Sequence, residues 1–152
     1  MKFVKRGPPG FAPMYAAEAE GLAALRAAGA PERYGHGVRG GEAFIEMERL
    51  ELGGSADWPA LARMLAGLHR NIGPRYGWEK DNWIGLAPQH NGWSDDWSEF
   101  WRERRLEPQL AMARSNGLSI DCGPLLQQLP VFFDDHRPQA SLLHGALWSG
   151  NI

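Results

Sequence analysis

Two polar residues near the end of the chain, His144 and Asn151, have types and a spacing suited to phosphoryl transfer. They follow a short apolar run, Leu142 and Leu143. Phosphotransferases of the protein-kinase type place a catalytic loop H-x-D-x-x-x-x-N after such a run. Its Asp accepts the substrate hydroxyl proton, and its Asn helps to hold a metal ion on the ATP phosphates. In this chain the Asp position is Ala146, so the pattern predicts a catalytic loop whose general base is missing.

A lysine and a glutamate near the start of the chain form a second candidate pair. Phe3, Val4 and Lys5 have the character of a strand end, and Glu18 lies one helical turn before Leu22 in an alanine-rich stretch. Taken alone, a lysine at a strand end and a glutamate on a helix are most often solvated. The sharper interpretation is an ion pair that holds Lys5 on the α- and β-phosphates of ATP, as kinases require.

Two further stretches have compositions that could serve a ligand. Residues 48–50 follow a predicted strand, where a kinase hinge would pair its backbone with adenine, although a solvated strand end explains them equally well. Residues 73–93 are polar, aromatic and glycine-rich, and a loop of this length is uncommon unless it has a function. Five of the seven tryptophans fall between Trp78 and Trp101. They form either a plain aromatic core or the wall of a pocket for a sugar or a flat ring.

The periodicity of apolar residues predicts the elements that would position these side chains. The strongest pattern is Trp58, Leu61, Leu65, Leu68 and Ile72, with steps of three and four. The predicted elements are a helix over 15–28 closed by Gly29, a hairpin of strands 34–38 and 43–47 joined through Gly40 and Gly41, a helix over 55–71 capped by Asp57 or Ser55, a helix over 96–116 capped by Ser94 or Asp95 and kinked at Pro108, a helix over 121–135, and a catalytic-loop strand from Ser141.

The composition limits the class of protein. The chain has 152 residues, a net charge of −2 and 43% hydrophobic residues, which fits one soluble globular domain. The charge balance does not indicate a nucleic-acid or membrane partner. The single cysteine, Cys122, excludes an intramolecular disulfide framework and a thiolate zinc cluster. No apolar run approaches the roughly 20 residues of a membrane span, and the start of the chain lacks the apolar core of a signal peptide. We therefore expect a cytoplasmic protein.

Four passages together resemble the fructosamine kinase (ketosamine-3-kinase) family, in the aminoglycoside- and choline-phosphotransferase branch of the kinase-like fold. The most specific parts of this resemblance are the long passage with Asp-Asn, Gln and Trp and the Leu-Trp-Ser-Gly sequence before Asn151. The passages are Phe3 to Lys5; Tyr15 to Leu22; Tyr76 and Gly77 through Asp81, Asn82, Ile84, Gly85, Gln89, Asn91, Trp93, Asp96, Trp97 and Phe100 to Arg105, Leu106 and Gln109; and Leu143 to Gly145 with Leu147 to Asn151.

The resemblance implies an α+β fold that is a partial protein-kinase-like fold, predominantly helical with a small remnant of the N-lobe sheet. Residues 1–50 would be a partial N-lobe, and residues 51–152 a partial helical C-lobe that ends at the catalytic loop. The implied activity is transfer of the γ-phosphoryl group of ATP, with Mg²⁺, to the sugar of a small-molecule or protein-bound ketoamine, a step in protein deglycation.

The resemblance also implies a role for each candidate residue. Lys5 and Glu18 would orient the phosphates. The remaining assignments are Glu48, Arg49 and Leu50 to the adenine-binding hinge, His144 and Ala146 to the catalytic loop with Ala146 at the general-base position, Asn151 to Mg²⁺, and Trp148, Asp81 and Asn82 to the surroundings of the sugar.

Three departures from the family pattern lead us to expect an inactive chain. Ala146 has no proton acceptor. The chain ends one residue after Asn151, before the expected metal-binding Asp, and begins at the lysine strand, before the strands that would cover the nucleotide. Apolar faces at Val4 and over residues 121–135 should then favour self-association. Two alternatives remain open: a non-catalytic pseudokinase-like binding module for nucleotide or glycated amine, and the remnant of a split gene.

Overall fold

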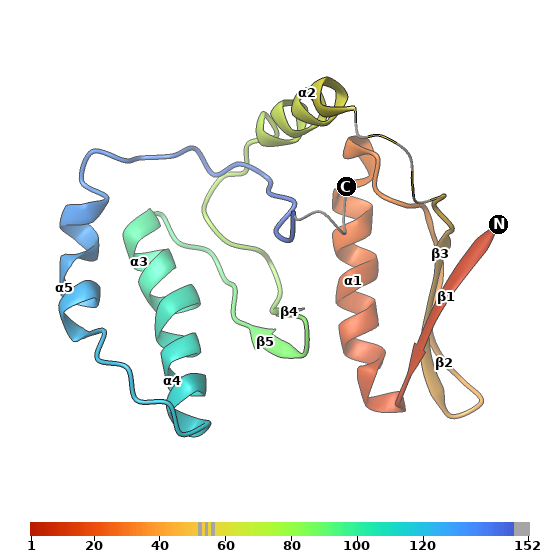
Figure 1. Ribbon diagram of the computed structural model, residues 1–152, viewed down its shortest axis with the longest axis horizontal. Coiled ribbons are helices and arrows are strands. Elements are labelled where there is room, and N and C mark those ends of the chain that lie inside the picture. The colour runs from red at the N-terminus through yellow and green to blue at the C-terminus, as the bar shows by residue number, and fades with distance from the viewer. Residues whose placement is uncertain (52, 54, 56, 148–152) are drawn as a thin grey trace. The chain divides into compact units, whose positions relative to one another are not determined.

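The computed structural model describes residues 1–51, 53, 55 and 57–147 and has the predicted mixture of helices and a small sheet (Figure 1). The elements are β1 (Lys2–Gly7), the 3-10 turn η1 (Pro9–Phe11), α1 (Ala12–Ala24), the 3-10 turn η2 (Arg26–Ala28), β2 (Arg33–Arg39), β3 (Glu42–Glu48), α2 (Trp58–His69), β4 (Asn82–Ile84), β5 (Ala87–Gln89), α3 (Trp97–Trp101), the π-helical segment η3 (Arg102–Leu106), α4 (Glu107–Ser115) and α5 (Gly123–Phe132).

The chain forms two compact units, which we describe separately. Among the described residues, unit 1 consists of those up to 71 together with 142–147, and unit 2 consists of residues 72–141. Residues 51–71 therefore group with the sheet by their contacts. The lobes that the resemblance assigns, residues 1–50 and 51–152, stay a prediction.

Unit 1 is built on an antiparallel sheet in the order β1–β3–β2, with α1 packed along one face (Figure 1). Gly40 and Gly41 connect β2 to β3 with φ angles of 61° and 81°. A two-residue turn with positive φ at both positions matches the twist of antiparallel strands, which explains why a pair of glycines occurs here. The predicted hairpin is confirmed, with each strand slightly longer than expected.

The core of unit 1 lies between β3 and α1. Alternation along a strand brings every second residue of β3 to the α1 face, where Ala43 and Ile45 are fully buried. Tyr15 and Ala19 of α1 pack against them, one turn apart on the helix. The full cluster is Tyr15, Ala19, Ala43, Ile45 and Met47, with the half-buried residues Phe11, Ala12, Met14 and Leu22.

The helices of unit 1 differ from their predicted bounds at their ends. The first helix begins earlier, at Ala12, because proline is favourable in a first helical turn, where its missing N–H is not needed. It continues after Ala24 as a 3-10 turn, and Gly29 closes that turn with a φ of 83°, as predicted for the cap. Helix α2 begins at Trp58, and Asp57 rather than Ser55 caps it by accepting the Ala60 N–H at 2.8 Å.

Unit 2 contains a hairpin where the sequence predicts only a loop. Within residues 73–93, β4 and β5 pair antiparallel through three residues each. Strands this short give too little alternation to be recognised. Gly85 in the turn between them has a φ of 59°. The prediction that residues 73–93 form a loop is therefore wrong in its middle part.

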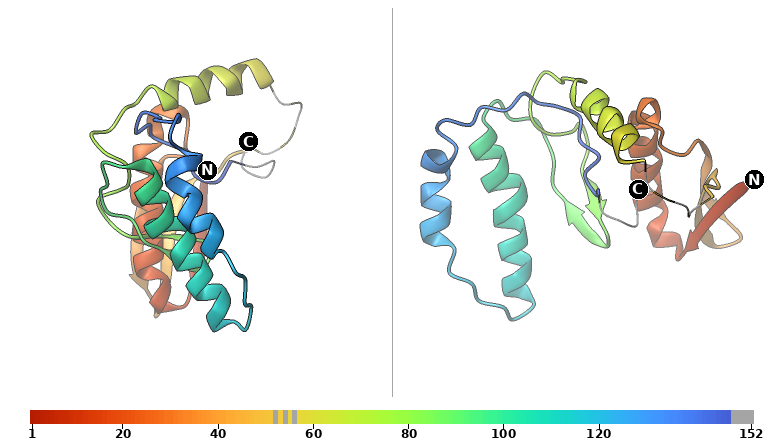
Figure 2. Two further views of the ribbon diagram at one scale, coloured as in Figure 1. Left: turned by 90° about the vertical axis from the view of Figure 1, so that its left-hand side faces the viewer. Right: turned by 45° about the horizontal axis from the view of Figure 1, so that its top comes forward.

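A continuous helical rod made of α3, η3 and α4 follows the hairpin (Figure 2). Asp96, not Ser94 or Asp95, caps its start by accepting the Glu99 N–H at 2.8 Å. The irregularity predicted at Pro108 takes the form of a π-helical segment just before it, because proline has no N–H for the residue 104 carbonyl. The guanidinium of Arg105 donates to that carbonyl at 2.8 Å.

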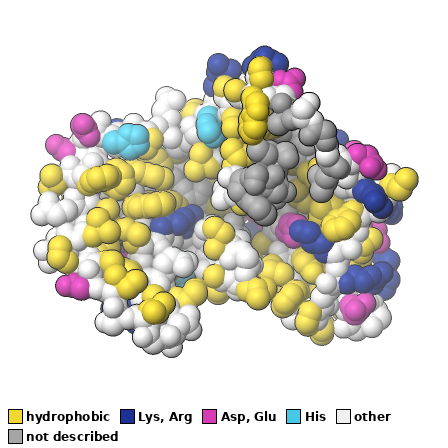
Figure 3. Space-filling model, in the orientation of Figure 1, with side chains coloured by type: hydrophobic (Ala, Val, Ile, Leu, Met, Phe, Trp, Pro, Cys, Tyr) yellow, Lys and Arg dark blue, Asp and Glu magenta, His cyan; other side chains and the backbone are white. Residues whose placement is uncertain are grey.

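The last helix, α5, is shorter than predicted and only partly covered. Leu129 is 3% exposed, whereas Val131 and Phe132 are each 71% exposed. Figure 3 shows apolar side chains gathered over this element. The predicted exposure of an apolar face on this helix is thus confirmed, as is that of Val4, which is 36% exposed. Self-association through such faces stays a prediction.

The predicted catalytic-loop strand is not formed. Ser141 makes a single isolated bridge with Ile72, and the described residues that follow it, 142–147, are irregular. This single bridge holds the start of the segment, but among the described residues no further strand pairing continues from it. In the part of the chain that the structure describes, no helix is both long and apolar enough to cross a membrane.

Candidate functional site

The predicted ion pair between Lys5 and Glu18 is present in unit 1. The Lys5 ammonium lies 2.5 Å from Glu18 Oε1. Alternation along β1 brings Lys5 to the same face of the sheet as α1, which carries Glu18 three residues after the buried Tyr15. The two side chains are 44% and 29% exposed, so the pair is open to a ligand.

The predicted hinge residues lie at the end of β3. The Glu48 N–H donates to the Glu32 carbonyl at 2.7 Å, and the Arg49 N–H donates to the Met1 carbonyl at 3.2 Å. These two donors are therefore engaged within unit 1. Leu50 lies beyond the strand and is 47% exposed, and the hinge role of these three residues stays a prediction.

The catalytic-loop candidates are only partly visible. His144 Nδ1 is buried and has no hydrogen-bond partner among the described residues, and Ala146 is exposed. A buried ring nitrogen normally has a partner, and the described residues supply none to His144. Trp148 and Asn151 lie outside the described residues. Across the described positions, no group of three or more His, Cys, Asp or Glu side chains could hold a metal ion.

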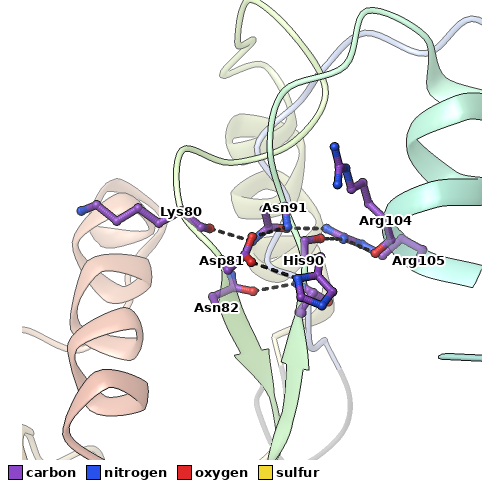
Figure 4. A network of polar contacts seen from close by, with 8 residues as sticks. Lys80, Asp81, Asn82, His90, Asn91, Arg104 and Arg105 are labelled. Atoms are coloured by element: carbon purple, nitrogen blue, oxygen red, sulfur yellow. Dashed lines mark hydrogen bonds and ion pairs between the residues drawn. The ribbon is translucent and has the colours of Figure 1, made fainter. Parts of the chain in front are cut away.

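In unit 2, the predicted substrate residues Asp81 and Asn82 belong to a polar network around the hairpin (Figure 4). Asp81 Oδ1 accepts the Asn91 N–H at 2.8 Å, and Asp81 Oδ2 lies 3.0 Å from His90 Nδ1. Asn82 Oδ1 accepts from Gln89 Nε2 at 3.0 Å across the two strands. Both predicted residues therefore use side-chain oxygens to hold the hairpin together.

Arg105 and Asn91 connect this hairpin to the helical rod. Arg105 donates to the His90 carbonyl at 2.6 Å and to Asn91 Oδ1 at 2.8 Å, and its guanidinium lies 4.6 Å from the centre of the Phe100 ring. Asn91 is 4% exposed and also donates to the Lys80 carbonyl at 2.9 Å. Asn91 and Arg105 are in the family passage but had no predicted role, because their function depends on tertiary contacts that no local pattern reveals.

The electrostatics of the network favour a charged Asp81. The Asn91 N–H first, and then the hydrogen bond with His90, hold the pKa of Asp81 below its usual range, and the positive charge of Arg104 acts in the same direction. Burial lowers the pKa of Arg105, which still remains a cation at neutral pH. The network thus has a fixed anion at one end and a desolvated cation at the other.

Known proteins resemble this chain in sequence and in fold. The family model described as fructosamine kinase matches residues 1–152. The chain belongs to the fructosamine kinase family. Its fold is that of solved members: a crystal structure assigned as a fructosamine-3-kinase from Haemophilus somnus matches with a TM-score of 0.90 and 31% identity, over 99% of this chain and 53% of that one.

Two curated relatives of this chain show the same partial coverage. A probable ketoamine kinase of Synechocystis is 39% identical over 145 residues, which are 91% of this chain and 49% of that protein. A chloroplastic protein-ribulosamine 3-kinase of Arabidopsis thaliana is 40% identical over 129 residues, which are 80% of this chain and 39% of that protein. The chain therefore spans about half the length of the relatives that it matches.

Proposed function

We propose that this protein is an ATP-dependent phosphotransferase of the ketosamine-3-kinase type, which phosphorylates the sugar of glycated amines and so takes part in protein deglycation. The observation that carries the proposal is the Lys5–Glu18 ion pair, 2.5 Å long, in a chain whose family match covers residues 1–152. The two named relatives support the substrate class, because one is called a ketoamine kinase and the other a protein-ribulosamine 3-kinase.

In this proposal Lys5 and Glu18 act together on the nucleotide. A lysine ammonium has three N–H donors, and Glu18 engages one, which leaves the others for phosphate oxygens. The carboxylate also fixes the long lysine side chain against α1, so less freedom is lost when a phosphate binds. ATP supplies the γ-phosphoryl group, and Mg²⁺ is the expected metal, with Asn151 as a proposed ligand.

Ala146 sets the expected rate. In the transfer, a sugar oxygen bonds to the γ-phosphorus, the bond from that phosphorus to the bridging oxygen of ADP breaks, and the hydroxyl proton must leave. An alanine methyl group cannot accept that proton or orient the hydroxyl. General-base catalysis contributes about 10²–10⁴-fold in rate. We therefore propose that the chain with Ala146 transfers phosphate more slowly, by this factor, than the same chain with Asp at position 146.

Nucleotide binding tests the role of Lys5. We expect millimolar Mg·ATP to raise the melting temperature of the chain, because a ligand that binds only the folded state stabilises it. Lys5→Met should remove this shift. Arg6→Met is the matched control, because Arg6 is the next residue of β1 and pairs with Glu42 instead. An unchanged melting temperature of the natural chain at millimolar Mg·ATP would contradict the proposal.

Phosphorylation tests the role of position 146. In a version with both flanks rebuilt as in the full-length relatives, Ala146→Asp should increase ATP-dependent phosphorylation of a glycated amine, measured as transfer of labelled phosphate, by about 10²–10⁴-fold. Ala146→Asn is the matched control, since an amide has nearly the same shape but accepts no proton. If the Asp variant transfers no more label than the Asn variant, the assignment of a general base to this position is wrong.

Ala146 also favours a second candidate, a non-catalytic module that binds nucleotide or glycated amine. The same two measurements separate the candidates. A module of this kind would show the Mg·ATP shift but no transfer in either variant, whereas a kinase that has lost only its base would regain transfer with Asp.

A further inference from the structure

A hollow of about 340 Å³ lies within unit 2, between the β4–β5 hairpin and the helical rod of α3, η3 and α4. Small-molecule sites are commonly concave, mostly apolar and about 300–1,000 Å³ in volume. Ile84, Pro88 and Trp101 contribute apolar wall on opposite sides of this hollow, and His90 and Gln89 contribute polar groups. The hollow thus has the size and wall composition of a site for a small ligand.

His90 presents a defined acceptor at this hollow. Asp81 is ionised and can only accept a hydrogen bond, so His90 Nδ1, 3.0 Å from Asp81 Oδ2, must carry the proton. In the neutral imidazole, Nε2 is then an acceptor. Among the described residues no hydrogen bond to His90 Nε2 is formed, and the side chain is 55% exposed. The carboxylate therefore selects the tautomer, and the opposite nitrogen is free for a ligand.

The charges and remaining polar groups define the ligand class. Arg104 and Arg105 line the hollow, and two cations disfavour an ammonium group. Arg105 donates to the carbonyls of His90 and Arg104 and to Asn91, which occupies three of the five N–H groups of its guanidinium. Gln89 donates its amide N–H to Asn82, so its oxygen is a second acceptor. Acceptors on His90 and Gln89 beside the arginine N–H donors fit hydroxyl groups, which both donate and accept hydrogen bonds.

We propose that this hollow binds the sugar ring of the ketoamine, with His90 Nε2 accepting from a sugar hydroxyl and the C–H face of the ring packed against Trp101. The assignment rests on the proposed function and deepens it. Asp81 becomes a positioning residue that acts through His90, and Asn82 acts likewise through Gln89. Both were predicted near the sugar, and their side-chain bonds within the hairpin explain why the contact passes to their neighbours.

Binding of a ketoamine without ATP tests the site. The probe is the adduct of glucose and lysine, titrated into the ¹⁵N-labelled 152-residue chain and followed by NMR, with unmodified lysine as the ligand control. We expect the Trp101 indole N–H and the His90 ring nitrogens to shift with the adduct and not with lysine. His90→Phe should weaken binding about tenfold, the loss expected for one hydrogen bond. His69→Phe, at an exposed position at the end of α2, should bind like the natural chain.

Asp81→Ala tests the positioning role separately. The ring ¹⁵N shifts should then report a mixture of the two neutral tautomers, and binding should weaken less than with His90→Phe. Equal affinity in His90→Phe and the natural chain, or no binding of the adduct at millimolar concentration, would overturn the site. These outcomes do not depend on phosphate transfer, so failure of the sugar site and failure of the proposed kinase activity are distinguishable.

Discussion

The two units use their charged side chains in opposite ways. In unit 1 the core is apolar, and the Lys5–Glu18 pair lies at its edge with side chains 44% and 29% exposed. In unit 2 the polar side chain of Asn91 is 4% exposed and depends on Arg105 as a partner. An exposed ion pair contributes roughly 0–1 kcal/mol, whereas a buried polar group left without a partner costs about 1–3 kcal/mol. The Lys5–Glu18 pair of unit 1 is thus available for function, while Arg105 of unit 2 maintains the structure by satisfying Asn91.

The largest effect on the free energy of unfolding is expected from a change in the backbone of unit 2. Gly77 has a φ of 122°, and a Cβ there would lie 2.0 Å from the Gly92 carbonyl oxygen. Gly77→Ala must separate the two segments that hold the hairpin, so we expect a loss of at least about 3 kcal/mol in the free energy of unfolding, measured by urea denaturation.

Gly85→Ala is the control for this change. Gly85 also has positive φ, 59°, but a Cβ there would meet no atom within 4 Å. It should cost only about 1–2 kcal/mol for the left-handed backbone. Equal losses for the two variants would show that conformation, rather than close approach, sets the cost at Gly77.

The second prediction concerns the cation of unit 2. Arg105→Met keeps the length of the side chain but leaves Asn91 Oδ1 and the His90 carbonyl without this donor. We expect a loss of about 2–4 kcal/mol in the free energy of unfolding. Arg104→Met, one residue earlier and exposed, should change it by less than about 0.5 kcal/mol. If both substitutions lower the free energy of unfolding equally, unit 2 does not depend on its buried polar contacts and does not differ from unit 1 in this respect.

The sequence predicted the two units unequally well, for a physical reason. In unit 1 the α1 face and the Gly40–Gly41 turn follow from local periodicity and turn chemistry, whereas the Lys5–Glu18 pair was expected from the kinase pattern and the family resemblance. In unit 2 the hairpin strands are only three residues long, and the roles of Asn91, His90 and Arg105 arise from contacts between residues 14 and 15 positions apart. Short strands carry little periodic signal, and a polar network is specified by tertiary proximity rather than by spacing.

The third prediction concerns the cap of α3. Asp96 accepts the Glu99 N–H and the Ser98 hydroxyl, and these bonds, in this order, hold the pKa of Asp96 below its usual range. Asp96→Ala should lower the free energy of unfolding by about 1 kcal/mol, as for other N-cap residues. Because the folded-state pKa is the lower one, the contribution is complete above the unfolded-state pKa of about 3.9 and is lost as the pH falls through the folded-state pKa.

The pH dependence provides the check on Asp96. Urea denaturation of the natural chain and the Asp96→Ala variant from neutral pH to about pH 3 should show a difference that shrinks on acidification. Asp95→Ala is the neighbouring control, because Asp95 pairs with Arg75 and does not cap the helix. A difference between the natural chain and Asp96→Ala that stays constant over this range would contradict the role of the charged cap.

The smallest effect on stability is expected at the pair with the clearest proposed function. Lys5→Met removes an ion pair whose members are both partly exposed, so the free energy of unfolding should change by less than about 1 kcal/mol. The Mg·ATP shift in melting temperature should nevertheless disappear, because the phosphate donor is gone. A large loss of stability with an unchanged nucleotide shift would reverse the assignment, making Lys5 a structural residue of unit 1. Since exposed pairs contribute so little to folding, the nucleotide response of this variant distinguishes function from packing more directly than any substitution in unit 2.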